Sequence, residues 1–156
     1  MVPSQIQLSD EQKKLITTTW LMIRPNLMDH GVHIFVEFFE RFPDNQKYFP
    51  KFEGVPISEI NQFPAVRIHA LNLISMFDKT ISMFELKGGM EEIARIWNEL
   101  GQTHKSRSLP RQSFLDMRQV ILDYFARVMQ LSENNKKSYA TLIDWVYEIF
   151  FERQYN

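Results

Sequence analysis

The 156-residue chain contains no cysteine, so it offers neither a disulfide framework nor a thiolate metal site. It also has no excess charge of one sign, because 18 basic and 19 acidic residues give a formal net charge of -1. Proteins that bind the phosphate backbone of nucleic acids normally carry a strong basic excess. We therefore expect no nucleic-acid partner.

Long apolar runs are missing as well. No stretch reaches the roughly 18 apolar residues that a membrane-spanning helix needs. The N-terminal residues 1–14, MVPSQIQLSDEQKK, lack the apolar core of a signal peptide. We expect a soluble, cytoplasmic protein without a membrane span.

Repeats, linkers and low-complexity tracts are also absent, and the length suits one domain with a substantial core. We therefore expect a single domain over residues 1–156, with a loose tail at residues 1–7. The chain does have 13 Phe, 3 Trp and 8 Met. Most of these side chains are expected in the core, but such an excess of large flat or flexible groups also suits a large planar ligand.

The hydrophobic periodicity is helical almost everywhere, which predicts an all-α fold. Ser9 is expected to cap a first helix that runs to about Arg24, before Pro25. Proline and glycine residues between Pro43 and Pro64 exclude a long helix there. The other helices are expected at 26–42, at about 65–84 and 90–105, and as two long amphipathic helices after a break at 106–110.

One of these helices carries a histidine on its apolar face. His104 continues a stripe with helical spacing that consists of Ile93, Ile96, Trp97 and Leu100. A core histidine that hydrogen-bonds to a neighbouring carbonyl explains this position. A metal or cofactor ligand also explains it, because imidazole is a common metal ligand and an apolar face keeps water from competing.

A second histidine strengthens the ligand interpretation. His69 lies on the inner face expected for the helix at 65–84, together with Val66, Leu73, Met76 and Phe77. A flat ligand between the two helices could be held by one imidazole and touched by the other, with Phe35, Phe49 and Leu73 around it. Two unrelated core histidines remain the alternative. His30 and His33 are expected to be packing or surface groups.

The sequence contains, in this order, Trp20, Pro43, Phe49, His69 and His104. This set resembles the globin family, and in particular the intracellular haemoglobins of insects and other invertebrates. Trp20 matches the tryptophan of the first helix, Pro43 a helix-ending proline, and Phe49 the phenylalanine that packs on the haem. The segment RIHALNL, with His69, is similar to the distal segment, and LGQTHKSRSLP, with His104, to the proximal one. The resemblance implies a globin fold of seven to eight helices around a haem pocket.

This resemblance implies haem b, iron protoporphyrin IX, as the cofactor. It makes His104 the proximal iron ligand and His69 the distal residue, which either stabilises a bound gas or acts as a sixth ligand. The Leu100 carbonyl and Thr103 are candidates to orient the second nitrogen of His104. The remaining residues expected at the cofactor are Phe35, Phe49, Phe52, Leu73, Leu100, Arg107, Leu109 and Phe114.

The charged residues expected near the haem propionates are Lys51, Lys105 and Arg107, although ordinary solvated charges are the alternative for each. Asn72 departs from the family pattern, in which a basic residue is frequent one turn beyond the distal histidine. The segment 82–92, SMFELKGGMEE, is longer than in vertebrate oxygen-storage globins. A longer connection between the two helices could let the helix of His69 shift, and such a shift would affect whether His69 itself binds iron.

The leading function implied is reversible binding of O2, and of other diatomic gases such as CO and NO, for storage, transport or buffering, without enzymatic chemistry. The alternative is a haem redox protein or sensor, of the nitric-oxide dioxygenase or nitrite reductase type, with bis-histidyl iron. We expect five-coordinate resting iron, because Phe35 and Leu73 fill the space that a shift of haem or helix would need. A homo-oligomer is compatible with the sequence, and a non-haem helical binding protein is a third alternative.

Overall fold

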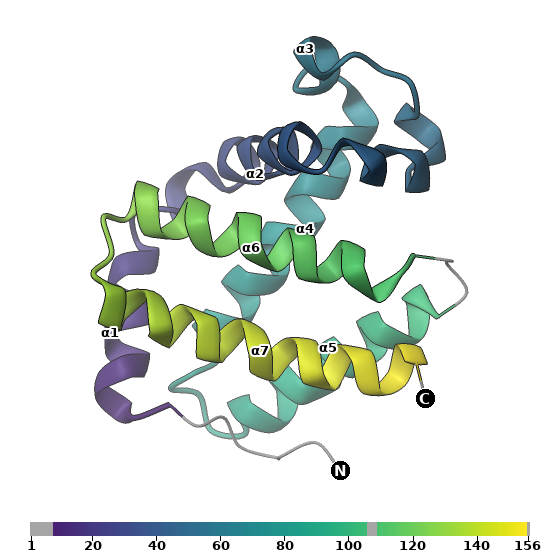
Figure 1. Cartoon of the computed structure of the whole chain (residues 1–156). Coiled ribbons are helices and arrows are strands. Elements are labelled where there is room, and N and C mark those ends of the chain that lie inside the picture. The colour runs from purple at the N-terminus through teal and green to yellow at the C-terminus, as the bar shows by residue number, and fades with distance from the viewer. Residues whose placement is uncertain (1–7, 106–108, 156) are drawn as a thin grey trace.

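The computed structural model describes residues 8–105 and 109–155, with side chains to Glu152, so the expected tail at residues 1–7 lies outside the described residues. The described residues form helices and turns, which confirms the all-α prediction (Figure 1). None of these helices is long and apolar enough to cross a membrane. The elements are α1 Asp10–Trp20, η1 Arg24–Asn26, α2 Leu27–Arg41, η2 Pro43–Tyr48, η3 Pro50–Phe52, α3 Ile57–Ile60, α4 Pro64–Ser82, α5 Gly89–His104, α6 Arg111–Val128 and α7 Glu133–Tyr155, where η marks a 3-10 helix.

Helix α1 begins where the sequence predicts but ends earlier. The Ser9 side chain accepts a hydrogen bond from the backbone N–H of Gln12, whose side chain accepts one from Ser9 in return, which forms a capping box. The helix ends at Trp20 rather than near Arg24. The chain instead closes with 3-10 hydrogen bonds, from Met22 to Thr19 and from Ile23 to Trp20. Pro25 follows in η1, and it has no N–H with which to continue an α-helix.

Trp20 fastens α1 to the rest of the fold. Its side chain is fully buried, and its ring meets Phe125 of α6 edge-on at a centroid distance of 5.4 Å. The indole N–H donates to a carboxylate oxygen of Asp78 on α4 over 2.9 Å. The Asp78 carboxylate also accepts from Arg24 over 2.8 Å, so one acidic side chain joins α4 to α1 and to the turn after it.

Helices α2 and α4 cross in close contact, and a glycine makes this possible. A Cβ atom added to Gly31 would lie 2.5 Å from the backbone oxygen of Ala70, closer than such contacts allow. Residue 31 therefore has to be glycine for the two helices to keep this distance. Because Ala70 follows His69 directly, the crossing also sets the position of that histidine relative to α2.

The segment between Pro43 and Pro64 contains only short helices, as predicted from its prolines. The side-chain amide of Gln46 donates to the backbone oxygens of Phe52 and Val55 over 2.9 and 2.7 Å. Asn45 is buried and accepts a hydrogen bond from Ser113 of α6 over 2.5 Å. The Gln46 contacts thus close the segment 43–64 on itself, and the Asn45 contact fixes it to α6.

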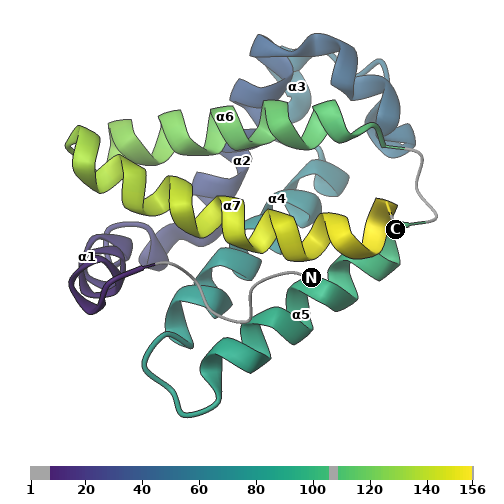
Figure 2. The same ribbon diagram turned by 60° about the horizontal axis from the view of Figure 1, so that its bottom comes forward.

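Helix α5 follows α4 after a short turn in which Gly88 has a φ of 75°, a conformation that glycine adopts easily. The indole N–H of Trp97 on α5 donates to the Thr80 hydroxyl on α4 over 2.8 Å, within the buried core. The final two helices run antiparallel, and α7 lies between α6 and α5 (Figure 2). The fold thus holds α4 and α5, the helices that carry His69 and His104, in fixed relation.

Candidate functional site

His104 lies in the last turn of α5, and its ring orientation is determined by a backbone carbonyl. The Nδ1 atom of His104 lies 2.9 Å from the carbonyl oxygen of Leu100. A carbonyl oxygen can only accept, so Nδ1 carries the proton and the lone pair of the neutral ring lies on Nε2. This is the tautomer in which a histidine binds a metal through Nε2 while its other nitrogen is anchored.

Thr103 lies beside the same hydrogen bond. Its hydroxyl donates to the Leu100 carbonyl over 2.8 Å and lies 3.3 Å from Nδ1 of His104. Both groups that the sequence suggests for orienting His104 therefore stand at its Nδ1 edge. A core histidine would make the same hydrogen bond, but His104 is only half-buried. The ring thus keeps surface that a ligand could contact.

Two aromatic rings lie beside the imidazole of His104. Its ring lies 5.4 Å from Phe150 of α7 and 6.5 Å from Phe114 of α6, centroid to centroid, and meets both edge-on. Phe114 is among the residues predicted for the site. Phe150 is not, because its helical spacing marks it only as a core residue and gives no sign that α7 packs along α5.

His69 is surrounded by a different set of rings. It meets Phe49 and Phe52 edge-on at centroid distances of 5.7 and 5.9 Å. We define the corner cluster as these three residues with Phe35 and Phe39, which contact Phe49 at 6.0 and 5.4 Å. Phe39 is fully buried and was not predicted for the site, although its place in the Phe-rich second helix offered a hint.

Phe49 and Phe52 differ in exposure although they stack on each other at 5.0 Å. Phe52 is 1% exposed and therefore belongs to the core. Phe49 is half-buried. Of the two rings, Phe49 is the one with surface left for contact with a ligand beside His69.

The inner face of α4 is narrower than the sequence predicts. Val66 and Phe77 are fully buried, as expected, but His69, Leu73 and Met76 are only half-buried. The fully buried stripe of α4 consists of Val66, Ala70, Ile74, Phe77, Thr80 and Ile81. His69, Leu73 and Met76 form a second, neighbouring stripe, because residues three or four apart share a face of a helix.

The charged residues expected at the propionates lie at the surface where the structure describes them. Lys51 and Lys105 are exposed, and so is Asn72. Arg107 lies outside the described residues. Leu109, the other predicted contact in this region, is half-buried.

The other two histidines lie on α2 and contact α6. His30 is half-buried and His33 exposed, in agreement with the expectation of packing or surface groups. Burial lowers the pKa of His30, and the neighbouring His33 lowers it further. The described residues contain no group of three or more His, Cys, Asp or Glu side chains placed to hold a metal ion.

Residues 32–150 match the sequence model of the globin family. The chain belongs to the globin family. Globin CTT-Z of Chironomus thummi piger is 23% identical over 93% of this chain and 86% of its own. The structure of a hexa-coordinate hemoglobin of Drosophila melanogaster superposes with a TM-score of 0.87 at 32% identity, over 92% of this globin and 94% of that chain. The hemoglobin of the botfly Gasterophilus intestinalis shares the fold, with a TM-score of 0.87 at 21% identity over 96% of this globin and all of that chain (100%).

Membership of the family makes haem the cofactor that this globin has to accommodate, and the residues present fit it. A single imidazole with an anchored Nδ1 is a ligand set that haem iron uses, and it does not need the three-residue cluster of other metal sites. Half-buried apolar side chains offer surface to a flat, mostly apolar ring. They include Leu73 on α4 and Phe49 in the corner cluster.

Proposed function

We propose that this globin holds haem b through His104 and reversibly binds diatomic gases on the side of His69, with O2 as the principal ligand, for storage, transport or buffering. The observation that carries the proposal is the hydrogen bond between Nδ1 of His104 and the Leu100 carbonyl. It sets the tautomer and the direction of the ring before any cofactor is bound. No enzymatic step is needed for this function.

When bound, haem would supply a ferrous iron that binds a small gas such as O2, CO or NO, and an imidazole of the protein would hold that iron. His104 provides the imidazole from α5. Phe114 and Phe150 confine the ring from α6 and α7, so it is restrained on several sides. Phe49 and Leu73 would offer apolar surface on the side of His69, which would limit the access of water.

His69 contributes polarity to that apolar side. An imidazole N–H that donates to a gas carrying partial negative charge stabilises it by about 1 kcal/mol or somewhat more. O2 becomes more polarised than CO on binding, so His69 favours O2 over CO. The contacts with Phe49 and Phe52 restrict where the His69 ring can point.

The second candidate is a redox or sensor globin, of the nitric-oxide dioxygenase or nitrite reductase type, in which His69 is itself a ligand. The hexa-coordinate hemoglobin of Drosophila, at 32% identity, favours it. The expectation of five-coordinate iron rests on Phe35 and Leu73. Phe35 lies in the corner cluster, where Phe39 and Phe49 pack around it and limit its ability to move aside.

The absorption spectrum of the deoxygenated ferrous protein distinguishes these functions. A single broad visible band indicates five-coordinate iron and supports simple gas binding. Sharp split bands indicate that a second protein ligand is bound, and an O2 equilibrium curve with turnover measurements on nitric oxide and nitrite then decides between the two roles. A purified protein that takes up no haem would contradict both.

Three properties stay predictions from the sequence: a cytoplasmic location, a single domain over residues 1–156 and the formation of a homo-oligomer. Gel filtration across a range of concentrations tests the oligomer. Limited proteolysis followed by mass measurement tests the extent of the domain.

A further inference from the structure

The chain has four histidines, and only two of them lie at the candidate haem site. The other two, His30 and His33, lie one turn apart on α2, so their side chains share a face of the helix. That face meets α6 at Tyr124, which is 4% exposed. The proposed haem function gives this second pair of histidines no role.

The two imidazoles converge on one oxygen atom. The Tyr124 hydroxyl oxygen lies 2.7 Å from Nδ1 of His30 and 3.4 Å from Nδ1 of His33. Both contacts use the same ring nitrogen, so each imidazole turns its Nδ1 toward the phenol oxygen. The Tyr124 ring lies 5.9 and 6.4 Å from the two imidazoles, centroid to centroid.

These distances fall in the range expected for ligands of one metal ion. Zinc ligands lie about 2.0 Å from the ion at tetrahedral angles, which places them about 3.3 Å from one another. The 3.4 Å separation matches this value, and the 2.7 Å hydrogen bond needs to open by only a fraction of an ångström.

We propose that His30, His33 and Tyr124 form a surface site for a divalent transition-metal ion of the Zn²⁺ type, with the two Nδ1 atoms and the phenol oxygen as ligands and water completing the coordination. Imidazole suits zinc, copper and nickel, whereas carboxylate-rich sites suit magnesium and calcium. Since the described residues contain no group of three or more His, Cys, Asp or Glu placed to bind metal, the site depends on the tyrosine.

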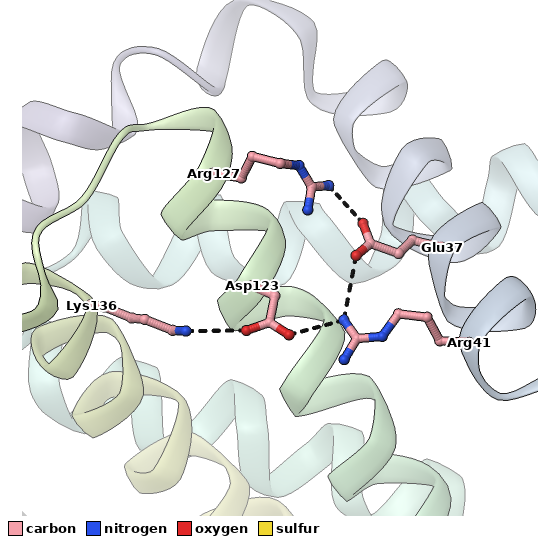
Figure 3. A network of polar contacts seen from close by, with 5 residues as sticks. All are labelled: Glu37, Arg41, Asp123, Arg127 and Lys136. Atoms are coloured by element: carbon pink, nitrogen blue, oxygen red, sulfur yellow. Dashed lines mark hydrogen bonds and ion pairs between the residues drawn. The ribbon is translucent and has the colours of Figure 1, made fainter.

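The surroundings admit a cation. His33 is exposed, which gives the site an entrance, while Tyr124 is buried at its base. The guanidinium of Arg127 lies 5.5 Å from the Tyr124 ring centroid, and its charge is offset by Glu37, to which it donates a hydrogen bond of 2.8 Å (Figure 3). Asp29, next to His30 in the sequence, adds a negative charge nearby.

Zinc binding at this site should also release a proton. The single proton of the Tyr124 hydroxyl can be donated to only one of the two imidazoles. Coordination requires both rings to carry their proton on Nε2 and the phenol to lose its own proton. Zinc binding therefore releases about one proton per ion, and the affinity rises with pH.

Isothermal titration of the carbon-monoxide-bound ferrous haem protein with zinc sulfate tests the site. In this form His104 is expected to hold the haem and His69 to lie beside the bound gas, and Zn²⁺, unlike Cu²⁺, does not oxidise ferrous iron. We expect one zinc ion per chain. Titrations in two buffers of different ionisation enthalpy should show the released proton.

Three variants locate the ion. The loss of a residue that merely orients a ligand costs about 10- to 100-fold in metal affinity, so His30→Gln, His33→Gln and Tyr124→Phe should each weaken zinc binding by at least that much. Glu40→Gln, at an exposed position of the same helix, should leave it unchanged. Circular dichroism and the haem spectrum check that each variant is folded.

Two outcomes overturn the proposal. One is the absence of zinc binding to the parent protein at millimolar zinc. The other is zinc binding that survives in any of the three site variants, since the ion then lies elsewhere or the phenol is not a ligand. The comparison of variants remains valid if the protein takes up no haem, so failure of the proposed haem function is distinguishable from failure of this site.

Discussion

The imidazole of His104 donates through Nδ1 to the carbonyl oxygen of Leu100, one turn earlier on α5, over 2.9 Å. This carbonyl lies near the C-terminal end of α5, and the Thr103 hydroxyl also donates to it, over 2.8 Å. The helix end thus orients the side chain that we propose as the iron ligand.

His104→Ala should abolish stable haem retention, because no other described histidine lies on α5 to replace it. The measurement is the rate at which haem passes to an excess of an unrelated apo-globin. His104→Gly leaves room for a small molecule, so added imidazole should restore part of the binding. A His104→Ala variant with a full haem complement and an unchanged spectrum would show that the assignment is wrong.

Phe49→Ala should accelerate haem loss more than Phe52→Ala does, since Phe49 is half-buried and Phe52 is 1% exposed. Removing a large buried aromatic side chain costs about 3–5 kcal/mol, so Phe52→Ala should instead lower the stability of the apoprotein. Urea unfolding of the apoproteins separates the two effects. Equal rates of haem loss in both variants would remove the reason for placing Phe49 at the haem.

His69→Leu should raise the O2 dissociation rate about tenfold, because the loss of roughly 1.4 kcal/mol of hydrogen-bond stabilisation is a factor of ten. CO dissociation should change little, since CO is less polarised. Met76→Leu, a change of apolar shape on the same half-buried stripe, is the matched control and should leave the O2 rate unchanged.

The same variant reports on coordination. If His69 binds iron in the resting ferrous protein, the parent shows split bands that His69→Leu converts to one broad band, and association of CO becomes faster. That result would overturn the expectation of five-coordinate iron and make the redox or sensor function as well supported as O2 binding. Unchanged O2 kinetics and an unchanged spectrum would exclude both roles for His69.

Gly31→Ala should destabilise the protein although alanine favours helix by about 1 kcal/mol. The added Cβ would meet the Ala70 carbonyl oxygen at 2.5 Å, and that atom is backbone, so α2 and α4 must separate. Overpacking of this kind costs about 1–3 kcal/mol. The urea midpoint of the apoprotein measures it, and an equal or higher midpoint would mean that the two helices lie farther apart.

Asp123→Asn should weaken the network that joins α2, α6 and α7 (Figure 3). Asp123 accepts hydrogen bonds from Arg41 over 2.9 Å and from Lys136 over 3.1 Å. Partial burial alone would raise its pKa, but the hydrogen bonds from Lys136 and Arg41 outweigh this and hold the pKa below the usual value. The side chain is 35% exposed, so we expect a loss of only about 0.5–1 kcal/mol at pH 7.

The stabilisation that Asp123 contributes should decrease at low pH. A carboxyl group with a lowered pKa in the folded protein stabilises it above the unfolded value of about 3.9, and this stabilisation is lost as the pH falls through the folded pKa. The difference between parent and Asp123→Asn should therefore be constant from pH 7 to pH 5 and shrink below about pH 4. Glu148→Gln, at an exposed position of α7, is the control. A difference that grows on acidification would refute the assignment.

Much of the fold followed from local rules in the sequence. Ser9 begins α1 because its side chain can satisfy a helix N–H, and Pro43 follows α2 because proline cannot continue a helix. The segments expected as helices at 26–42 and 90–105 agree with α2 and α5 to within a residue at each end. The periodicity predicted inward faces for His69 and His104, because a period of 3.6 residues needs no knowledge of the partner helix, and both side chains are half-buried.

The sequence by itself thus determined the helical class, the bounds of α2 and α5, and the choice of two histidines for the candidate haem site. Only the tertiary structure decided that α4 buries one stripe fully and leaves His69, Leu73 and Met76 half-buried, since periodicity defines a face but not which part of it a neighbour covers. Packing also brought Phe150 to His104, and Tyr124 to His30. Those contacts join helices far apart in the chain, and no local pattern encodes which ridge of one helix enters which groove of another.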